Sequence, residues 1–137
     1  MILMSTLLLV ILSHLSFASD LTVRVTDLIN HDGSIHYLIF NSKDGYPDDE
    51  KKGFLKGTIK ASESSFTLKG LPDGEYSVSL VHDENNNQKL DTILGIPREG
   101  FAFSNNPRVY FGPPSFDKTK VRIEKDTDIK VKMKYMK

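Results

Sequence analysis

The 137-residue sequence contains no cysteine and no tryptophan. Without cysteine the chain can form no disulfide bond, no thiolate metal site and no cysteine nucleophile, and its redox compartment stays open. A net charge is also missing, because 18 basic and 18 acidic residues cancel. The overall charge therefore gives no reason to expect nucleic acid or an anionic membrane surface as a partner.

Long hydrophobic runs are missing as well, except at the N-terminus, where residues 2–15 are almost all apolar. Ser16 and Ala18 then place small residues at the −3 and −1 positions of a cut after Ala18. This pattern predicts a secretory signal peptide over residues 1–18, although no lysine or arginine precedes the run. The alternative is a membrane anchor, but the run is shorter than the ~20 residues that span a bilayer. We therefore expect a periplasmic or secreted protein with one domain over residues 19–137.

The rest of the chain alternates apolar and polar residues with a period of two, which is the pattern of half-buried β-strands. The segments with this character are 21–26, 54–61, 65–68, 75–81, 120–124 and 129–135. The segment 34–40 is apolar on both sides instead, which predicts a central strand. Residues 41–53 form a polar segment that predicts a solvated loop or a short helical turn. No stretch shows a sustained 3.6-residue period. The sequence thus predicts an all-β fold, an antiparallel β-sandwich of about seven strands with one long loop segment, 82–116.

Several motifs occur in order along the chain. They are LPDGEY at 71–76, HDEN at 82–85, KLDT at 89–92, LGIPREG at 94–100, FSNN at 103–106 and FGPPSF at 111–116. Together they resemble the pattern of a secreted bacterial family known as domain of unknown function 2141. The resemblance implies a small exported domain of the transthyretin-like or prealbumin-like sandwich type, without an established activity. Members usually carry glycine where this chain has Asn86 and Gln88, so we expect a stiffer or differently turned loop here.

The long segment also contains a candidate calcium site. Four side chains with oxygen ligands stand at positions 1, 3, 5 and 9 of a loop, and one main-chain carbonyl stands at position 7. These residues are Asp83, Asn85, Asn87, Asp91 and, for the carbonyl, Lys89. Alternate oxygen ligands at this spacing can converge on a hard cation. With only two carboxylates we expect weak binding, about 10⁻⁴–10⁻³ M.

The EF-hand pattern is incomplete in this loop. Gln88 replaces the glycine of position 6, Leu94 replaces the bidentate glutamate of position 12, and the flanks are not helical. A calcium ion would need a further ligand, for which Glu84 and Glu99 are nearest in sequence. The alternative is an asparagine-rich turn that is held by side-chain hydrogen bonds and binds no ion.

A catalytic interpretation uses His82, Asp83 and Ser104, the residue types of a hydrolase triad. Neighbouring residues on a strand point to opposite faces, so Asp83 is not expected to orient His82, and no nucleophile-elbow motif is present. We expect His82 to be a hydrogen-bonded histidine at the edge of the core, and we expect the same of His36.

Two functions therefore remain open at this point. The first is an exported non-catalytic module that binds an unknown protein or small-molecule ligand, with or without calcium. Its long loop and four aromatic residues either complete the core or present a binding surface; these four are Phe101, Phe103, Tyr110 and Phe116. The second is a hydrolase-like enzyme that uses His82. The first predicts a buried His82, and the second requires His82 in an open cleft beside a nucleophile.

Overall fold

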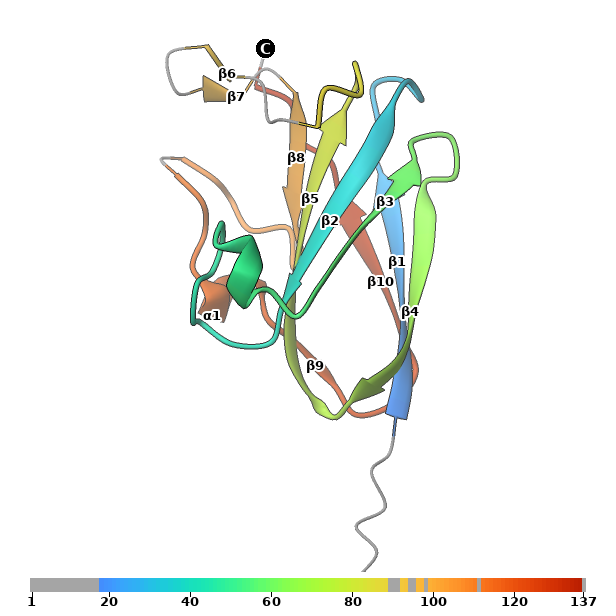
Figure 1. The fold of residues 1–137 in the computed structure, drawn as a ribbon, viewed down its shortest axis with the longest axis vertical. Coiled ribbons are helices and arrows are strands. Elements are labelled where there is room, and N and C mark those ends of the chain that lie inside the picture. The colour runs from blue at the N-terminus through green and yellow to red at the C-terminus, as the bar shows by residue number, and fades with distance from the viewer. Residues whose placement is uncertain (1–17, 89–91, 94–95, 98, 111, 137) are drawn as a thin grey trace, which may run out of the picture.

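The computed structural model describes residues 18–88, 92–93, 96–97, 99–110 and 112–136. The described residues form two facing β-sheets and a separate two-stranded antiparallel sheet, residues 92–93 with 96–97, shown as a ribbon in Figure 1. The elements in chain order are β1 (Ala18–Thr26), β2 (Ser34–Phe40), the 3₁₀ helix η1 (Glu50–Lys52), β3 (Leu55–Lys60), β4 (Ser65–Pro72), β5 (Gly74–Asp83), β6 (Thr92–Ile93), β7 (Ile96–Pro97), β8 (Gly100–Phe103), α1 (Phe116–Thr119), β9 (Val121–Ile123) and β10 (Thr127–Lys132). The predicted all-β sandwich is confirmed.

The larger sheet has the order β3-β2-β5-β8, and β9 pairs with the beginning of β5. The smaller sheet has the order β10-β1-β4. Nearly all described pairs are antiparallel, as predicted. The exception is the pair of β1 and β10, which run parallel with Leu21 opposite Thr127 and Thr26 opposite Lys132. The first strand of the sandwich therefore lies between the last strand and β4.

The core lies between the two sheets and consists of the apolar residues that alternate along the strands. Its fully buried members are Leu21, Val23, Ile35, Ile39, Val78, Ile123 and Val131. The lysines that alternate with them on the last strand face solvent, because Lys130 and Lys132 are exposed. This edge strand thus has a solvent face whose positive charges discourage pairing with another sheet edge.

The outer face of the larger sheet is only partly covered. At one end, Phe40 lies edge-on to Tyr46, which lies edge-on to Phe116, with ring centroids 5.5 and 5.7 Å apart. The 41–53 segment contains the short helical turn η1, as predicted, and Phe116 begins the helix α1, which the period-two pattern did not predict. The other end of this face is open.

Within the described residues, no helix is long and apolar enough to cross a membrane. The predicted signal peptide falls almost wholly on residues 1–17, which lie outside the described residues. The next residue, Ala18, begins β1 and is paired with Pro72 of β4.

Candidate functional site

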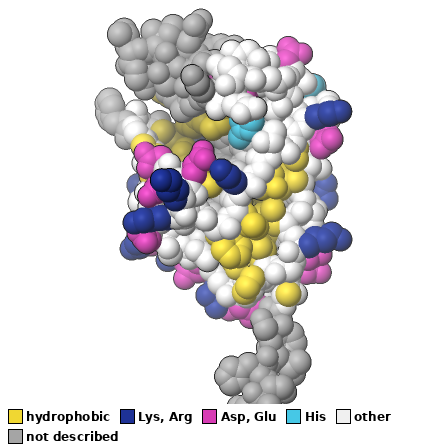
Figure 2. Space-filling model, in the orientation of Figure 1, with side chains coloured by type: hydrophobic (Ala, Val, Ile, Leu, Met, Phe, Trp, Pro, Cys, Tyr) yellow, Lys and Arg dark blue, Asp and Glu magenta, His cyan; other side chains and the backbone are white. Residues whose placement is uncertain are grey.

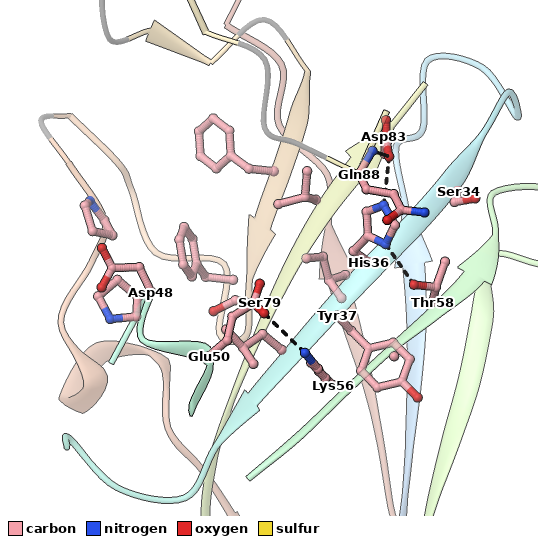
Figure 3. Close-up of a pocket in the computed structure, with 18 of the residues that line it drawn as sticks. Ser34, His36, Tyr37, Asp48, Glu50, Lys56, Thr58, Ser79, Asp83 and Gln88 are labelled. Atoms are coloured by element: carbon pink, nitrogen blue, oxygen red, sulfur yellow. Dashed lines mark hydrogen bonds and ion pairs between the residues drawn. The ribbon is translucent and has the colours of Figure 1, made fainter. Parts of the chain in front are cut away.

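A half-open groove of about 1430 Å³ occupies the uncovered end of the larger sheet's outer face. In Figure 2, hydrophobic side chains lie recessed on this side of the molecule, bordered by acidic and basic side chains. Figure 3 shows that lining residues come from β2, β3 and β5 and from the segment around η1. The groove is therefore framed by sheet on its floor and by loops at its sides.

The register of the strands fixes the floor of this groove. One cross-strand row contains Thr58, His36, Val81 and Phe101, and the next contains Lys56, Leu38, Ser79 and Phe103. Polar residues thus lie toward β3 and aromatic residues toward β8. Cross-strand neighbours on one face of a sheet have Cβ atoms about 4.5–5.5 Å apart, so the rows are continuous surfaces.

Among the floor residues that the structure describes, Ser79 has a polar side-chain atom that is shielded from water and has no protein partner. Its Oγ atom is buried, and within the described residues it has no hydrogen-bond partner. A buried hydroxyl without a partner is uncommon in native structures, because desolvation of such a group costs free energy. Ser79 lies between Leu38 and Phe103 on the floor of the groove. A ligand or an ordered water in the groove would supply the hydrogen bond that the protein does not.

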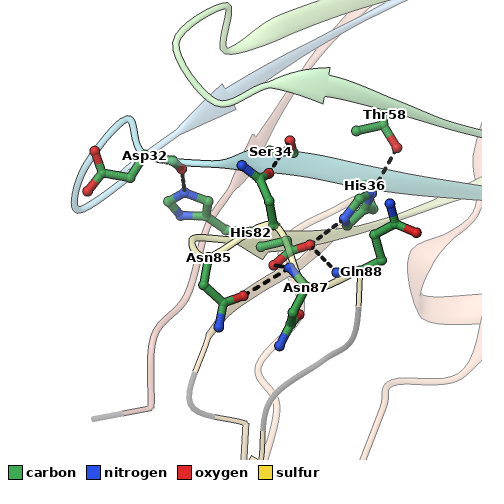
Figure 4. A network of polar contacts seen from close by, with 10 residues as sticks. Asp32, Ser34, His36, Thr58, His82, Asn85, Asn87 and Gln88 are labelled. Carbon is green, nitrogen blue, oxygen red and sulfur yellow. Dashed lines mark hydrogen bonds and ion pairs between the residues drawn. The ribbon is translucent and has the colours of Figure 1, made fainter.

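His36 joins the groove to the loop after β5. Its Nε2 atom lies 2.8 Å from Oδ2 of Asp83, and its Nδ1 atom lies 2.8 Å from Oγ1 of Thr58 (Figure 4). The Asp83 side chain is fully buried, whereas that of His36 is 30% exposed. These three residues stand on three adjacent strands, and they form a continuous chain of polar contacts along one wall.

The Asp83 carboxylate also holds the loop itself. It accepts hydrogen bonds from the backbone N–H of Asn87 (3.1 Å) and of Gln88 (2.7 Å). Burial acts to raise the pKa of Asp83, but the hydrogen bonds from His36 and from these two amides outweigh burial and hold the pKa below its usual value. Asp83 therefore remains ionised in the folded protein at neutral pH.

The backbone of the loop takes the conformation that glycine would allow. Asn86 and Gln88 have φ angles of 56° and 61°. The loop thus keeps left-handed residues at the two positions where the resembled family usually has glycine. Asparagine adopts this conformation readily, whereas glutamine is strained there. The two hydrogen bonds from the amides of Asn87 and Gln88 to Asp83 oppose that strain.

The structure brings together only part of the predicted calcium ligands. Asp83 is buried, and Asn85 and Asn87 are exposed, with Oδ1 of Asn85 accepting a hydrogen bond from the backbone of Asn87. The other two residues, Lys89 and Asp91, lie outside the described residues. No group of three or more His, Cys, Asp or Glu side chains in the described part of the chain is placed to hold a metal. The described contacts are those of a hydrogen-bonded turn, and calcium binding stays a prediction.

His82 lies on the core side of β5, as predicted, and is fully buried. Its Nε2 atom donates to the backbone carbonyl of Asp32, so Nδ1 of the neutral ring accepts from the Tyr135 hydroxyl, both at 2.7 Å. Ser104 is also buried, and its hydroxyl donates to the backbone carbonyl of Thr119. His82 therefore has neither the open cleft nor the nucleophile that the hydrolase alternative requires.

For His36 the expectation of a core-edge histidine is wrong. Adjacent positions on β2 point to opposite faces, and His36 lies on the groove side while Ile35 lies in the core. Asp83 does orient a histidine, but it is His36 of the neighbouring strand. The sequence analysis also missed Thr58 and Ser79, since only the strand register places them beside His36 and Phe103.

The four aromatic residues singled out in the long segment divide between core and groove. Phe101 and Phe116 are each 8% exposed, whereas Tyr110 is 69% exposed and Phe103 is partly buried. Phe101, Phe103 and Tyr110 line the groove, with the two phenylalanine rings 6.2 Å apart. The segment thus both completes the covered part of the molecule and supplies an aromatic wall.

The fold and the groove define a small β-sandwich with a half-open cleft on one sheet. Residues 23–131 match the family DUF2141, described as an uncharacterized protein conserved in bacteria, and the chain belongs to this family. The resemblance seen in the motifs is confirmed to that extent, and the transthyretin-like type of sandwich stays a prediction. Searches of curated proteins and of solved structures found no match to the chain.

Proposed function

We propose that the protein is an exported binding module that holds a small organic ligand in the groove on the outer face of β3-β2-β5-β8. The observation that carries the proposal is the buried Ser79 hydroxyl, which has no described partner and lies beside an aromatic wall. Ligand sites are typically concave and mostly apolar, with a few polar groups that fix the ligand's orientation. The groove has this composition.

The two sides of the groove favour a ligand with two different ends. Phe101, Phe103 and Tyr110 offer an apolar and aromatic surface on which a ring or hydrocarbon body can pack. Thr58 offers a hydroxyl group on the side toward β3, and Ser79 carries another in the floor between Leu38 and Phe103. Lys56 lies 3.3 Å from Glu50 across the mouth, so the rim is not strongly charged at this point. We therefore expect an uncharged or weakly charged ligand that has both an apolar body and a hydroxyl or carbonyl group.

A tryptophan reporter tests the binding site, because the chain has no tryptophan of its own. We expect the fluorescence of a Phe103→Trp variant to change when compounds of this kind are added at saturating concentration. Phe54→Trp is the matched control, since Phe54 is 37% exposed and packs on Tyr76 away from the groove lining. Equal responses in both variants, or amide NMR shifts that map elsewhere than Ser79, Val81 and Phe103, would count against the groove.

Export is tested separately. The apolar run at 2–15 and the small residues that follow it support cleavage after Ala18. Protein recovered from the periplasm or medium of the source cells should begin at Ser19 or within about two residues of it. Recovery of cytosolic protein with Met1 intact would contradict export, and it would leave the groove as a site for an intracellular ligand.

Calcium is a further element of the proposal, with its support in the spacing of the loop oxygens. Thermal unfolding is measured with EGTA and then with several millimolar calcium. The midpoint temperature should be higher with the ion, and Asp91→Ala should abolish the difference. Asp91→Ala is more informative than Asp83→Ala, since Asp83 has hydrogen bonds to lose in either case. Identical midpoints in the parent protein would favour the hydrogen-bonded turn.

A further inference from the structure

We propose that Thr58, His36 and Asp83 act as a hydroxyl–imidazole–carboxylate relay that hydrolyses small carboxylic esters in the groove. The proposal rests on the groove of the proposed function and goes beyond binding. The sequence analysis assigned none of the three residues to this arrangement. They meet because β3, β2 and β5 are neighbours, with Thr58 directly opposite His36 and Asp83 one diagonal step away.

The direction of each hydrogen bond in the relay follows from which of its atoms can carry a hydrogen. An ionised carboxylate only accepts, so the Nε2 atom of His36 carries the hydrogen that Asp83 Oδ2 accepts at 2.8 Å. In the neutral ring the other nitrogen, Nδ1, then has a free lone pair, and it accepts from the Thr58 hydroxyl at 2.8 Å. A hydroxyl that donates to an imidazole held by a carboxylate is the arrangement of an activated nucleophile.

Asp83 is the positioning residue of this relay. Its side chain is fully buried and is fixed by the backbone amides of Asn87 and Gln88, so it can hold the ring of His36 in one orientation. Among triads of this kind the carboxylate orients the imidazole and stabilises its protonated form.

Thr58 is accessible to a substrate, whereas Asp83 is not. Thr58 is exposed on the edge strand β3 and lines the groove. Figure 3 shows Thr58 of β3 beside His36, and Lys56 of the same strand turned toward Glu50. Lys56 precedes Thr58 by two residues and projects from the same face of the strand. Its ammonium group is paired with Glu50 at 3.3 Å, and it would offset negative charge near Thr58 only after leaving that partner. Val81 and Phe101 continue the row as a surface for an acyl chain.

The reaction is acyl transfer to water. Thr58 Oγ1 attacks the ester carbonyl carbon while its proton passes to His36 Nδ1, which gives a tetrahedral oxyanion. Collapse breaks the bond to the alkoxy oxygen, which leaves as the alcohol with the proton from Nδ1. Water then attacks the acyl-Thr58 carbonyl and gives a proton to Nδ1. Release of the carboxylic acid returns that proton to Thr58 Oγ1, so ester and water become acid and alcohol with no other reactant.

The competing explanation is that the same contacts only tie the loop to the sheet. A pair of substitutions at Thr58 separates the two, because valine keeps the shape and β-propensity of threonine and serine keeps its hydroxyl. Thr58 is exposed, so neither variant should alter the thermal midpoint much. When Phe103→Trp is combined with either Thr58 variant, its fluorescence should still change on addition of the compounds used to test the groove. This measurement distinguishes loss of turnover from loss of binding in the groove.

The assay uses the mature chain with p-nitrophenyl butyrate, and His31→Ala measures background from an exposed imidazole. We expect Thr58→Val and His36→Gln each to lower the rate at least about 100-fold, and Thr58→Ser to retain most of it. An alkyl fluorophosphonate should label Thr58 in the parent, with loss of fluoride, and should leave Thr58→Val unlabelled on peptide mass spectrometry.

Two results would overturn the relay. One is parent activity no higher than buffer at equal imidazole concentration. The other is a Thr58→Val rate within about twofold of the parent's, since a true nucleophile or base contributes far more than that. In either case an intact reporter response would leave the groove as a binding site only, and a lost response would remove the proposed function as well.

Discussion

At the scale of single residues, Asp83 connects the strand beside it to the loop that follows its own strand. Its carboxylate contacts His36 on β2, while the loop after β5 donates two backbone N–H groups to it. Such a buried acceptor costs free energy when its partners are removed, because the charge cannot return to water. The Asp83 side chain therefore contributes both to the stability of the fold and to the geometry of the groove.

Acid titration should reveal this coupling. The folded pKa of Asp83 is lowered below the unfolded value of ~3.9, so the unfolded chain takes up the proton first as the pH falls. Its stabilising contribution is then fully present above about pH 4–5 and is lost toward the folded pKa. Asp83→Asn should lower the free energy of unfolding by about 1–3 kcal/mol at neutral pH. It should also make this free energy fall less steeply as the pH is lowered, so the acid limb of the curve becomes flatter. Urea unfolding from pH 2.5 to 7 measures both effects.

The control for this titration is Asp117→Asn. A hydrogen bond from Lys43 also lowers the pKa of Asp117, but that pair is on the surface, where solvent screens the interaction. Asp117→Asn should therefore leave the acid limb nearly as steep as in the parent. Equal slopes in the parent and in Asp83→Asn would mean that Asp83 contributes no pH-dependent stability.

Gly33 shows how tightly the turn before β2 approaches the end of β5. Its φ angle is +69°, and a Cβ atom at this position would overlap the carbonyl oxygen of Asp83. Gly70 has nearly the same φ, +71°, but no atom within 4 Å of such a Cβ. Alanine at Gly70 should thus cost only the backbone strain, roughly 1–2 kcal/mol, and alanine at Gly33 should cost at least ~2 kcal/mol more. Thermal or urea unfolding gives the difference, and equal losses would show that the turn can move away.

At the scale of elements, the aromatic residues after β7 do not act as one group. Phe116 is 8% exposed at the start of α1 and packs edge-on to Tyr46, so Phe116→Ala should cost about 3–5 kcal/mol. Phe103 is only partly buried on the groove, and Phe103→Ala should cost about 1 kcal/mol. Urea unfolding of both variants compares them. A large loss at Phe103 would place its ring in the core, against the observed groove.

The period-two pattern predicted the main strands well, because each strand of a sandwich buries one face. It could not give the register, since pairing depends on which loops bring strands together, and the contact of Thr58 with His36 follows from register alone. The loop pattern identified Asp83 as a candidate ligand residue. It could not identify the partner of Asp83, because His36 is 47 residues away in sequence. The helix α1 is one turn long and offers too few residues for a helical period to appear.

At the scale of the whole molecule, the smaller sheet depends on its last strand. Val131 and Met133 are buried, and β10 pairs with β1 along six residues. Removal of residues 127–137 exposes these contacts and leaves β1 with one neighbour, a loss comparable to the ~5–15 kcal/mol that stabilises a typical domain. We expect this truncated chain to be unfolded by circular dichroism. Removal of residues 136–137 alone should leave it folded, because Met136 is 43% exposed.

The parallel pairing of β1 and β10 also sets an order in time. A chain that is made or threaded N-terminus first presents β1 early, but one of the two strands beside it arrives only with residue 132. Contacts between such distant residues form late, since a long loop must close before they are gained. The connectivity of the smaller sheet thus postpones its completion until β10 has been made. For a chain that is exported as proposed, a secretion channel that admits only extended polypeptide would receive it before this sheet had formed and could block passage.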